Sequence, residues 1–229
     1  MNLATVRRTV ALSGRDIQLE LPADPERILR QATVVEQSGG SPCDPYWSVL
    51  WDAAPKTAEL IVRHPWPTGL TALELGCGLG LAGIAAALAG LQVTLSDRVP
   101  EAVELAVRNA RANGLEQVSG LVLDWSAPIA RQFDVILASD VLYDRAGHAA
   151  LLHVVASMLT DDGVVWIGDT GRSNAPDFID QAAQQGWQIE ITDARGRVLP
   201  RFHPLDYQRI TLYRGAGMPR RAGSLFSDA

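Results

Sequence analysis

Residues 73–87 read LELGCGLGLAGIAAA. An apolar run typical of a β-strand leads into closely spaced glycines, and the residues after them favour a helix. Glycine leaves the backbone bare, so this order indicates a loop and a helix N-terminus that approach a ligand. Gly78, Gly80 and Gly83 also match the GxGxxG pattern of dinucleotide sites, although that match alone is weak.

Around and after this stretch, short β-type runs alternate with helical segments. Strand-like runs occupy residues 71–75, 91–97, 118–124, 133–140 and 164–169, and helical segments begin near residues 81, 100, 147 and 175. Such alternation is typical of a parallel sheet with helices on its faces. Two later runs, 187–194 and 207–213, are expected to pair as an antiparallel edge. The predicted fold class is α/β: a Rossmann-like, doubly wound, mostly parallel seven-stranded sheet with an antiparallel last strand.

The segment before the sheet predicts three further features. Residues 5–21 alternate apolar and polar side chains on both sides of a Ser-Gly pair, which indicates an N-terminal β-hairpin. Residues 36–45 are rich in Gly, Ser and Pro, so we expect a flexible connector, and whether it closes as a lid is left open. From Tyr46, apolar residues recur at spacings of three and four, which predicts one helix that ends near a His-Pro pair.

Composition narrows the classes of partner. The chain has 47% apolar residues and no apolar stretch near the roughly 18 residues of a membrane span, so we expect a cytoplasmic protein without a membrane partner. A net charge of −6 argues against nucleic acid, whose binding depends on clustered Lys and Arg. Neither Cys43 nor Cys77 belongs to a metal-ligand spacing, so we expect no metal site and no disulfide. We also expect a monomer.

Three consecutive predicted strands end on an acidic residue. Glu74 lies two positions before Gly76, where a carboxylate would repel a pyrophosphate and attract a cationic ligand. Asp97 ends the next strand about 20 positions after Gly76, the spacing at which an acid accepts from ribose hydroxyls. Asp124 and Trp125 follow the third strand, where they suit an adenine amino group and its ring. The pattern predicts S-adenosyl-L-methionine, whose methionyl part is cationic, as the cofactor.

The motifs LELGCGLG, TLSD and LDW resemble those of the class I seven-strand S-adenosylmethionine-dependent methyltransferases. The resemblance covers about residues 46–213 and narrows to the protein-lysine methyltransferases, which modify chaperones, elongation factors and the electron transfer flavoprotein β-subunit. It implies a methyltransferase domain over residues 46–213. The residue patterns place a hairpin and lid segment before it, over 1–45, and predict a flexible tail after it, over 214–229, where Gly, Pro and Arg occur without periodicity.

Shorter matches carry the narrower resemblance. LWDAA is similar to a segment whose tryptophan lines the cofactor pocket, which implies that role for Trp51. SDVLYD resembles an acidic-x-x-aromatic motif and implies substrate-pocket roles for Asp140 and Tyr143. PYW and IGDTGR are similar to segments of the electron-transfer-flavoprotein enzymes, where GDPGR is usual and Thr170 replaces the proline. The expected cofactor-binding residues are Trp51, Glu74, Gly76, Cys77, Gly78, Gly80, Asp97, Asp124, Trp125 and Ser139.

Methyl transfer is an in-line displacement that needs no covalent nucleophile. Asp140 is too weak a base to deprotonate an ammonium, but it can stabilise the positive charge that develops on the acceptor nitrogen. If Asp140 begins a helix, Tyr143 lies on the same face and flanks the acceptor. Val141 and Leu142 stand where amide methyltransferases of this class carry two prolines, which favours an aliphatic amine, most simply a protein lysine.

Alternative interpretations remain open at this point. A small-molecule N-methyltransferase would share the cofactor half, an NAD-dependent reductase would use the three glycines, and a catalytically silent relative would bind a partner. Some candidates also have structural explanations: Trp47 and Trp51 as core residues, Asp140 as a helix cap, and Asp169 with Arg172 as a solvated ion pair. Cys77 is a loop filler rather than a nucleophile.

Overall fold

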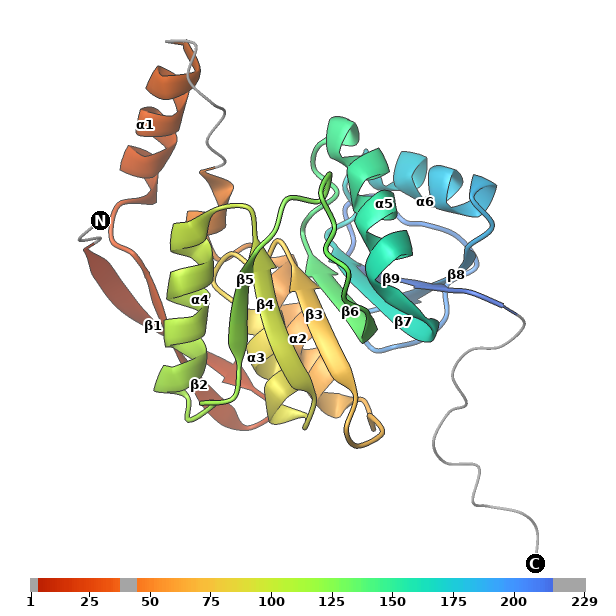
Figure 1. Cartoon of the computed structure of the whole chain (residues 1–229), viewed down its shortest axis with the longest axis horizontal. Helices are drawn as coiled ribbons and strands as arrows, with labels where there is room; N and C mark the ends of the chain where they lie inside the picture. Colours follow the sequence, from red (N-terminus) through yellow and green to blue (C-terminus); the bar gives the residue numbers. More distant parts are fainter. Residues whose placement is uncertain (1–3, 38–44, 216–229) are drawn as a thin grey trace, which may run out of the picture.

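Seven strands form one sheet in the order β5-β4-β3-β6-β7-β9-β8 in the computed structural model, which describes residues 4–37 and 45–215 (Figure 1). The strands are β3 (Thr71–Leu75), β4 (Gln92–Asp97), β5 (Ser119–Val122), β6 (Phe133–Ser139), β7 (Leu159–Asp169), β8 (Gln188–Asp193) and β9 (Gln208–Tyr213). Neighbours from β5 to β7 pair in parallel, whereas β9 runs antiparallel between β7 and β8. The predicted sheet, with its antiparallel last strand, is confirmed.

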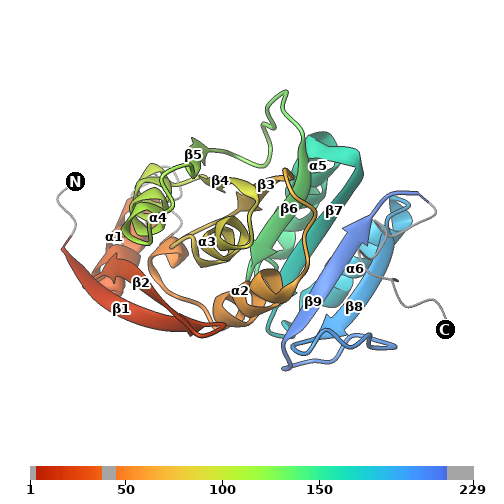
Figure 2. The ribbon, with the colours of Figure 1, turned by 90° about the horizontal axis from the view of Figure 1, so that it is seen from below.

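Helices cover both faces of the sheet (Figure 2). One face carries α2 (Ala53–Arg63), α3 (Leu81–Leu88) and α4 (Pro100–Ala112), and the other carries α5 (His148–Met158) and α6 (Ala175–Gln184). Because both faces are covered, the central strands are almost continuously apolar: Ala72–Leu75 and Val135–Ala138 are buried throughout. Glu74 is the one acidic residue in these two runs, and it lies beside the glycine loop.

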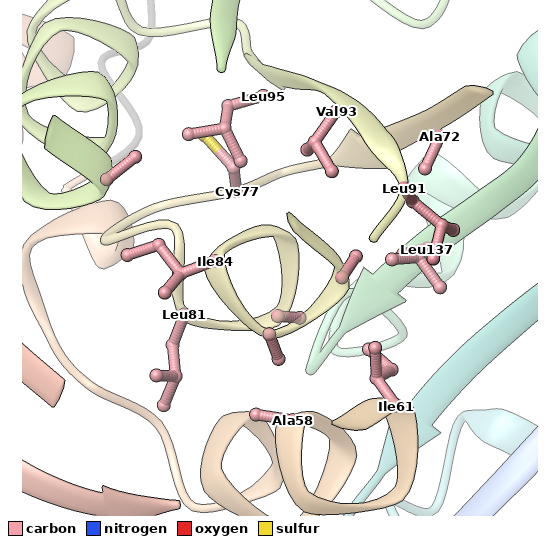
Figure 3. Close-up of a cluster of buried hydrophobic side chains, with 14 of the residues drawn as sticks. Ala58, Ile61, Ala72, Cys77, Leu81, Ile84, Leu91, Val93, Leu95 and Leu137 are labelled. Atoms are coloured by element: carbon pink, nitrogen blue, oxygen red, sulfur yellow. The ribbon is translucent and has the colours of Figure 1, made fainter. Parts of the chain in front are cut away.

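The core under the glycine loop is built from small and branched side chains (Figure 3). Leu81 and Ile84 of α3 lie between the sheet residues and Ala58 and Ile61 of α2. Cys77 is buried in the same cluster as a free thiol, and its burial raises its pKa. The thiol is therefore a neutral packing group, as expected of a loop filler.

The N-terminal hairpin forms as predicted and packs against α4 and α2, on the side away from the sheet (Figures 1 and 2). Its strands are β1 (Thr5–Leu12) and β2 (Arg15–Pro22), and Ser13 and Gly14 between them have positive φ, as two-residue hairpin turns require. Asn109 and Asn113 of α4 bind the main-chain N–H and C=O groups of Glu20 and Gln18. These side-chain amides pair part of the exposed edge of β2, which protects it from unwanted strand pairing.

Two segments differ from the sequence-based expectation. Residues 25–37 form α1 (Pro25–Gln37), where no helix was predicted, and Asp24 accepts from the Arg27 N–H at its start. The helix predicted from Tyr46 begins only at Ala53, as α2. Tyr46 lies in a short 3-10 turn, η1 (Tyr46–Ser48), and a break separates this turn from α2. Residues 38–44 of the predicted lid lie outside the described residues.

In the described part of the chain, no helix is long and apolar enough to span a bilayer.

Asn109→Ala should lower the free energy of unfolding by about 2–3 kcal/mol, because the buried amide also donates to the Leu79 carbonyl and its loss leaves several polar groups unpaired. Urea denaturation followed by circular dichroism measures this. Asn113→Ala is the control, since its bonds to Gln18 are exposed, and it should cost about 1 kcal/mol. Equal losses of stability in the two variants would contradict the larger stabilising role assigned to the buried Asn109 amide.

Candidate active site

A pocket of about 250 Å³ opens at the carboxyl ends of the parallel strands, where ligands bind in open α/β sheets. Its walls come from η1, the segment before α2, and the loops after β3, β4, β5 and β6. Every residue predicted for the site lines this pocket except one. The exception is Gly80, which begins α3 at a φ of 83° and lies against α4, where a Cβ would come within 2.9 Å of Ala106.

The glycine loop requires glycine for steric reasons on both of its sides. Gly76 and Gly78 have φ values of 61° and 49°. A Cβ at Gly76 would lie 3.1 Å from Val141 Cγ1, and one at Gly78 would lie 3.2 Å from the Trp47 carbonyl oxygen. The loop is thus closely packed between the segment after β6 and η1, and its bare backbone faces the pocket.

Glu74 lies beneath the loop rather than projecting freely into the pocket. Its Oε2 accepts from the Gly83 N–H at 2.8 Å, in the first turn of α3. Burial raises the pKa of Glu74 to about 8, with a smaller contribution from the neighbouring Asp97. Gly83 makes this contact possible, because a Cβ there would come within 2.7 Å of Oε2. Glu74 therefore supports the helix N-terminus in addition to lining the pocket.

Asp97 and Asp124 end the next two strands in different environments. Asp97 is buried, and its two carboxylate oxygens accept from the N–H groups of Gly78 and Val99 at 3.1 and 3.0 Å. Asp124 is exposed, and hydrogen bonds from the Ser126 hydroxyl and N–H lower its pKa. The half-buried Trp125 lies beside Gly76 and Gly147. The residues predicted to contact adenosine thus line one pocket, and their roles stay a prediction.

Asp140 has a strained backbone and does not begin a helix. Its φ is 60°, and its N–H donates to the Gly168 carbonyl at 2.8 Å. The next helical turn is η2 (Arg145–Gly147), so the expected helical i+3 arrangement with Tyr143 is wrong. Asp140 instead caps a distant helix: its Oδ2 accepts from the Ala53 N–H, the first residue of α2, at 3.2 Å. This long-range cap explains why α2 begins after the break rather than at Tyr46.

Arg172 pairs with Asp140 and not with Asp169. Its Nε and Nη2 donate to Asp140 Oδ1 at 2.8 and 2.7 Å. Asp169 is fully buried, and its Oδ1 accepts from the N–H groups of Gly171 and Arg172, while burial raises its pKa. The interpretation of Asp169 and Arg172 as a solvated ion pair is therefore wrong. Asp169 shapes the turn, and the turn directs Arg172 at Asp140.

Three half-exposed aromatic side chains line the pocket, and we name them the aromatic rim: Tyr46, Trp51 and Tyr143. The Tyr46 ring meets the rings of Trp51 and Tyr143 edge to face, at centroid distances of 6.2 and 5.6 Å. Trp51 is thus not a core residue, whereas Trp47 is buried against Leu79 and lines the pocket as well. The role of Tyr46 was not predicted, although it lies in the PYW segment.

The chain matches one protein family over most of the region that forms the sheet and the pocket. Residues 36–185, more than half of the chain, match a family model described as lysine methyltransferase. The chain belongs to this lysine methyltransferase family. A TehB-like S-adenosylmethionine-dependent methyltransferase from Corynebacterium glutamicum superposes with a TM-score of 0.58 at 19% identity, covering 84% of this chain and 99% of that one. At that identity the likeness concerns the fold, and it confirms the predicted fold class.

Two relatives in the sequence comparison differ in their acceptors. The electron transfer flavoprotein beta subunit lysine methyltransferase of Danio rerio is 28% identical over 137 residues, which cover 58% of this chain and 53% of that protein. The Homo sapiens histone-arginine methyltransferase METTL23 is 29% identical over 149 residues, covering 63% and 78%. This chain spans about half the length of the first relative. Membership in the family therefore does not identify the acceptor, and evidence on the acceptor has to come from the geometry of the site.

Glu74→Gln should remove a pH dependence of stability in the ligand-free protein. A carboxyl group whose pKa rises from 4.5 to about 8 on folding binds more protons in the folded state. Wild-type stability therefore falls as the pH rises from about 4.5 to about 8. The glutamine variant lacks this slope, and its advantage over wild type should grow with pH by on the order of a few kcal/mol. Urea denaturation at pH 5, 6, 7 and 8 measures it, and parallel curves would contradict the argument.

Proposed function

We propose that this protein transfers the methyl group of S-adenosyl-L-methionine to the side-chain amine of a lysine in another protein. One observation carries the proposal: in a member of the lysine methyltransferase family, one pocket joins acidic strand ends to a buried carboxylate surrounded by aromatic rings. We place the catalytic domain over residues 46–213. The proposal gives the acidic end to the cofactor and the aromatic end to the acceptor.

The acidic end suits a cationic nucleoside cofactor. Glu74, Asp97 and Asp124 line it, and among the described residues Arg98 is the only cation on the pocket wall. Because Glu74, with a pKa of about 8, is largely protonated near pH 7, Asp97 and Asp124 supply the charge that attracts a sulfonium and an ammonium and repels a pyrophosphate. This argues against an NAD-dependent reductase. When bound, S-adenosylmethionine supplies an activated methyl group on sulfur. We assign the ribose to Asp97 and the adenine to Asp124 and Trp125, as the sequence predicts.

The acceptor end suits lysine better than arginine. The lysine stem is apolar and its amine is small, so the aromatic rim can flank the stem while the nitrogen reaches Asp140. A guanidinium stays charged in proteins and binds carboxylates with paired donors. Asp140 Oδ1 already holds two such donors from Arg172. The site thus differs from what an arginine acceptor requires, and this supports a lysine acceptor.

The reaction forms a nitrogen–carbon bond and breaks a sulfur–carbon bond, and the nitrogen then loses its proton to water. A lysine ammonium has a pKa near 10.4, so presenting the neutral amine at pH 7.4 costs about 4 kcal/mol. Asp140 cannot recover that cost as a base, but its fixed Oδ2 can orient the amine and stabilise the charge that develops on nitrogen. Buried surroundings strengthen this interaction.

We also propose that the protein works as a cytoplasmic monomer on a protein partner and not on nucleic acid. The net charge of −6 and the buried free thiol of Cys77 support this setting. Size-exclusion chromatography with light scattering measures the oligomeric state. A stable dimer at micromolar concentration would contradict the monomer.

The acceptor class is tested with labelled cofactor. Purified enzyme is incubated with tritiated S-adenosylmethionine and a bacterial lysate, and total protein is hydrolysed and separated as amino acids. We expect the label in methylated lysine. Label confined to metabolites indicates a small-molecule N-methyltransferase, label in methylarginine indicates the arginine chemistry of the human relative, and either result rejects a protein-lysine acceptor.

Two substitutions, one at each end of the pocket, should affect cofactor binding and the methylation rate differently. Asp97→Asn should weaken the binding of S-adenosylhomocysteine about tenfold or more, because the removed charge supports both the glycine loop and the cofactor end. Asp140→Asn should leave that affinity unchanged and lower the methylation rate about 100-fold. Calorimetry and tritium transfer measure the two effects. Asp161→Asn, on an exposed side chain at the far end of β7, is the control for loss of an acid. Equal effects of the first two variants on binding would contradict the division.

A further inference from the structure

Asp140 is a buried carboxylate whose charge is already compensated. Its side chain is 3% exposed, and Arg172 gives it two charge-assisted hydrogen bonds. The N-terminus of α2 adds a third donor through the Ala53 N–H. A carboxylate has about four lone-pair positions, so the donors from described residues leave about one on Oδ2. That position faces the site as an acceptor that carries little net negative charge.

The chain holds Arg172 in this place through several contacts. Asp169 Oδ1 accepts from the N–H groups of both Gly171 and Arg172, which fixes the direction in which the arginine leaves β7. Gly171 has a φ of 79°, and a Cβ there would lie 2.4 Å from the Leu205 nitrogen. The guanidinium also lies 5.8 Å from the centre of the Trp51 ring, on the aromatic rim. These contacts hold the partly exposed guanidinium of Arg172 against Asp140, and Asp140 in turn lines the pocket.

This pairing bears on a difficulty that any lysine methyltransferase faces. An isolated carboxylate beside the acceptor would stabilise the ammonium, which has no lone pair, and would oppose the reaction. A carboxylate paired with a guanidinium loses most of that effect and keeps its capacity to accept a hydrogen bond from an amine N–H. We propose that Arg172 is a positioning residue that offsets the charge of Asp140, so that the acceptor lysine occupies the site as an uncharged amine. This inference rests on the proposed function.

Other titratable groups lie around Asp140, but none pairs with it as Arg172 does in the described residues. Burial raises the pKa of Tyr207 to about 12, so its phenol stays neutral near pH 7, and burial also raises the pKa of Asp169. Other titratable groups on the surrounding elements include Lys56 in α2, Asp52 before it, Asp144 and Arg145 after β6, Tyr46 and Tyr143 on the rim, and Glu74, Asp97, Arg98 and Asp124 at the cofactor end. A change at Arg172 therefore changes the balance at the carboxylate most directly.

The test is the pH dependence of methyl transfer at a lysate concentration high enough to saturate the rate, because that profile reports groups in the enzyme–acceptor complex. The rate is measured as tritiated methyl-lysine formed in bacterial lysate protein. In Arg172→Gln the uncompensated Asp140 should move the acidic limb of the profile to higher pH by about one unit. The rate at pH 7 should then fall about tenfold, and the difference from wild type should shrink above pH 9. Arg172→Lys keeps the positive charge and should keep the wild-type midpoint. Arg63→Gln, in an exposed ion pair with Glu59, is the matched control.

A series of variants that changes the net charge at Asp140 and Arg172 gives the direction of the midpoint shift, independently of how well any single variant folds. Asp140→Asn leaves Arg172 unpaired and should move the same limb to lower pH. The double variant Asp140→Asn/Arg172→Gln restores neutrality and should return the midpoint towards wild type. Rates that fall by one factor at every pH, with no change in midpoint, would show a purely structural arginine and overturn the inference. Absence of methyl-lysine with the wild-type enzyme would instead overturn the proposed function.

Discussion

One buried carboxylate, Asp140, joins three distant segments of the chain at the pocket. It extends from the end of β6, binds the first N–H of α2 and holds Arg172 from the turn after β7, while its own N–H donates to Gly168. These contacts fix the positions of two strand ends and one helix. The backbone of Asp140 has a positive φ, a conformation that costs energy and persists because these contacts outweigh the cost.

The acids at the cofactor end follow the same principle. Glu74 and Asp97 each accept from main-chain N–H groups around the glycine loop, at Gly83, Gly78 and Val99. Their carboxylates therefore shape the loop that receives the cofactor, and the same residues line the pocket. A ligand that binds here meets dipoles and charges that are already oriented, so little reorganisation is needed on binding.

The sequence predicted the sheet, its antiparallel last strand and the hairpin, because periodicity and turn residues are local signals. The pocket residues were recognised where they follow strands, as at Asp97 and Trp125. Long-range contacts were not visible: Asp140 capping α2, Arg172 reaching Asp140, and Asn109 pairing β2 each join distant segments. The missed helix α1 is different, since the Asp24-Pro25 pair is a readable helix start.

The two ends of the pocket differ in charge, and methyl transfer takes advantage of that difference. In the proposed reaction, positive charge first resides on sulfur beside the acidic strand ends, and the amine placed beside Asp140 is neutral. As the methyl group moves, charge appears on nitrogen, next to the Oδ2 position that Arg172 leaves available. In the proposed reaction the compensated carboxylate accepts one hydrogen bond from the neutral amine, and this bond strengthens only modestly as the nitrogen becomes cationic, because Arg172 offsets the charge of Asp140 throughout. The main contribution of Asp140 is then to aim the lone pair of the nitrogen at the methyl group.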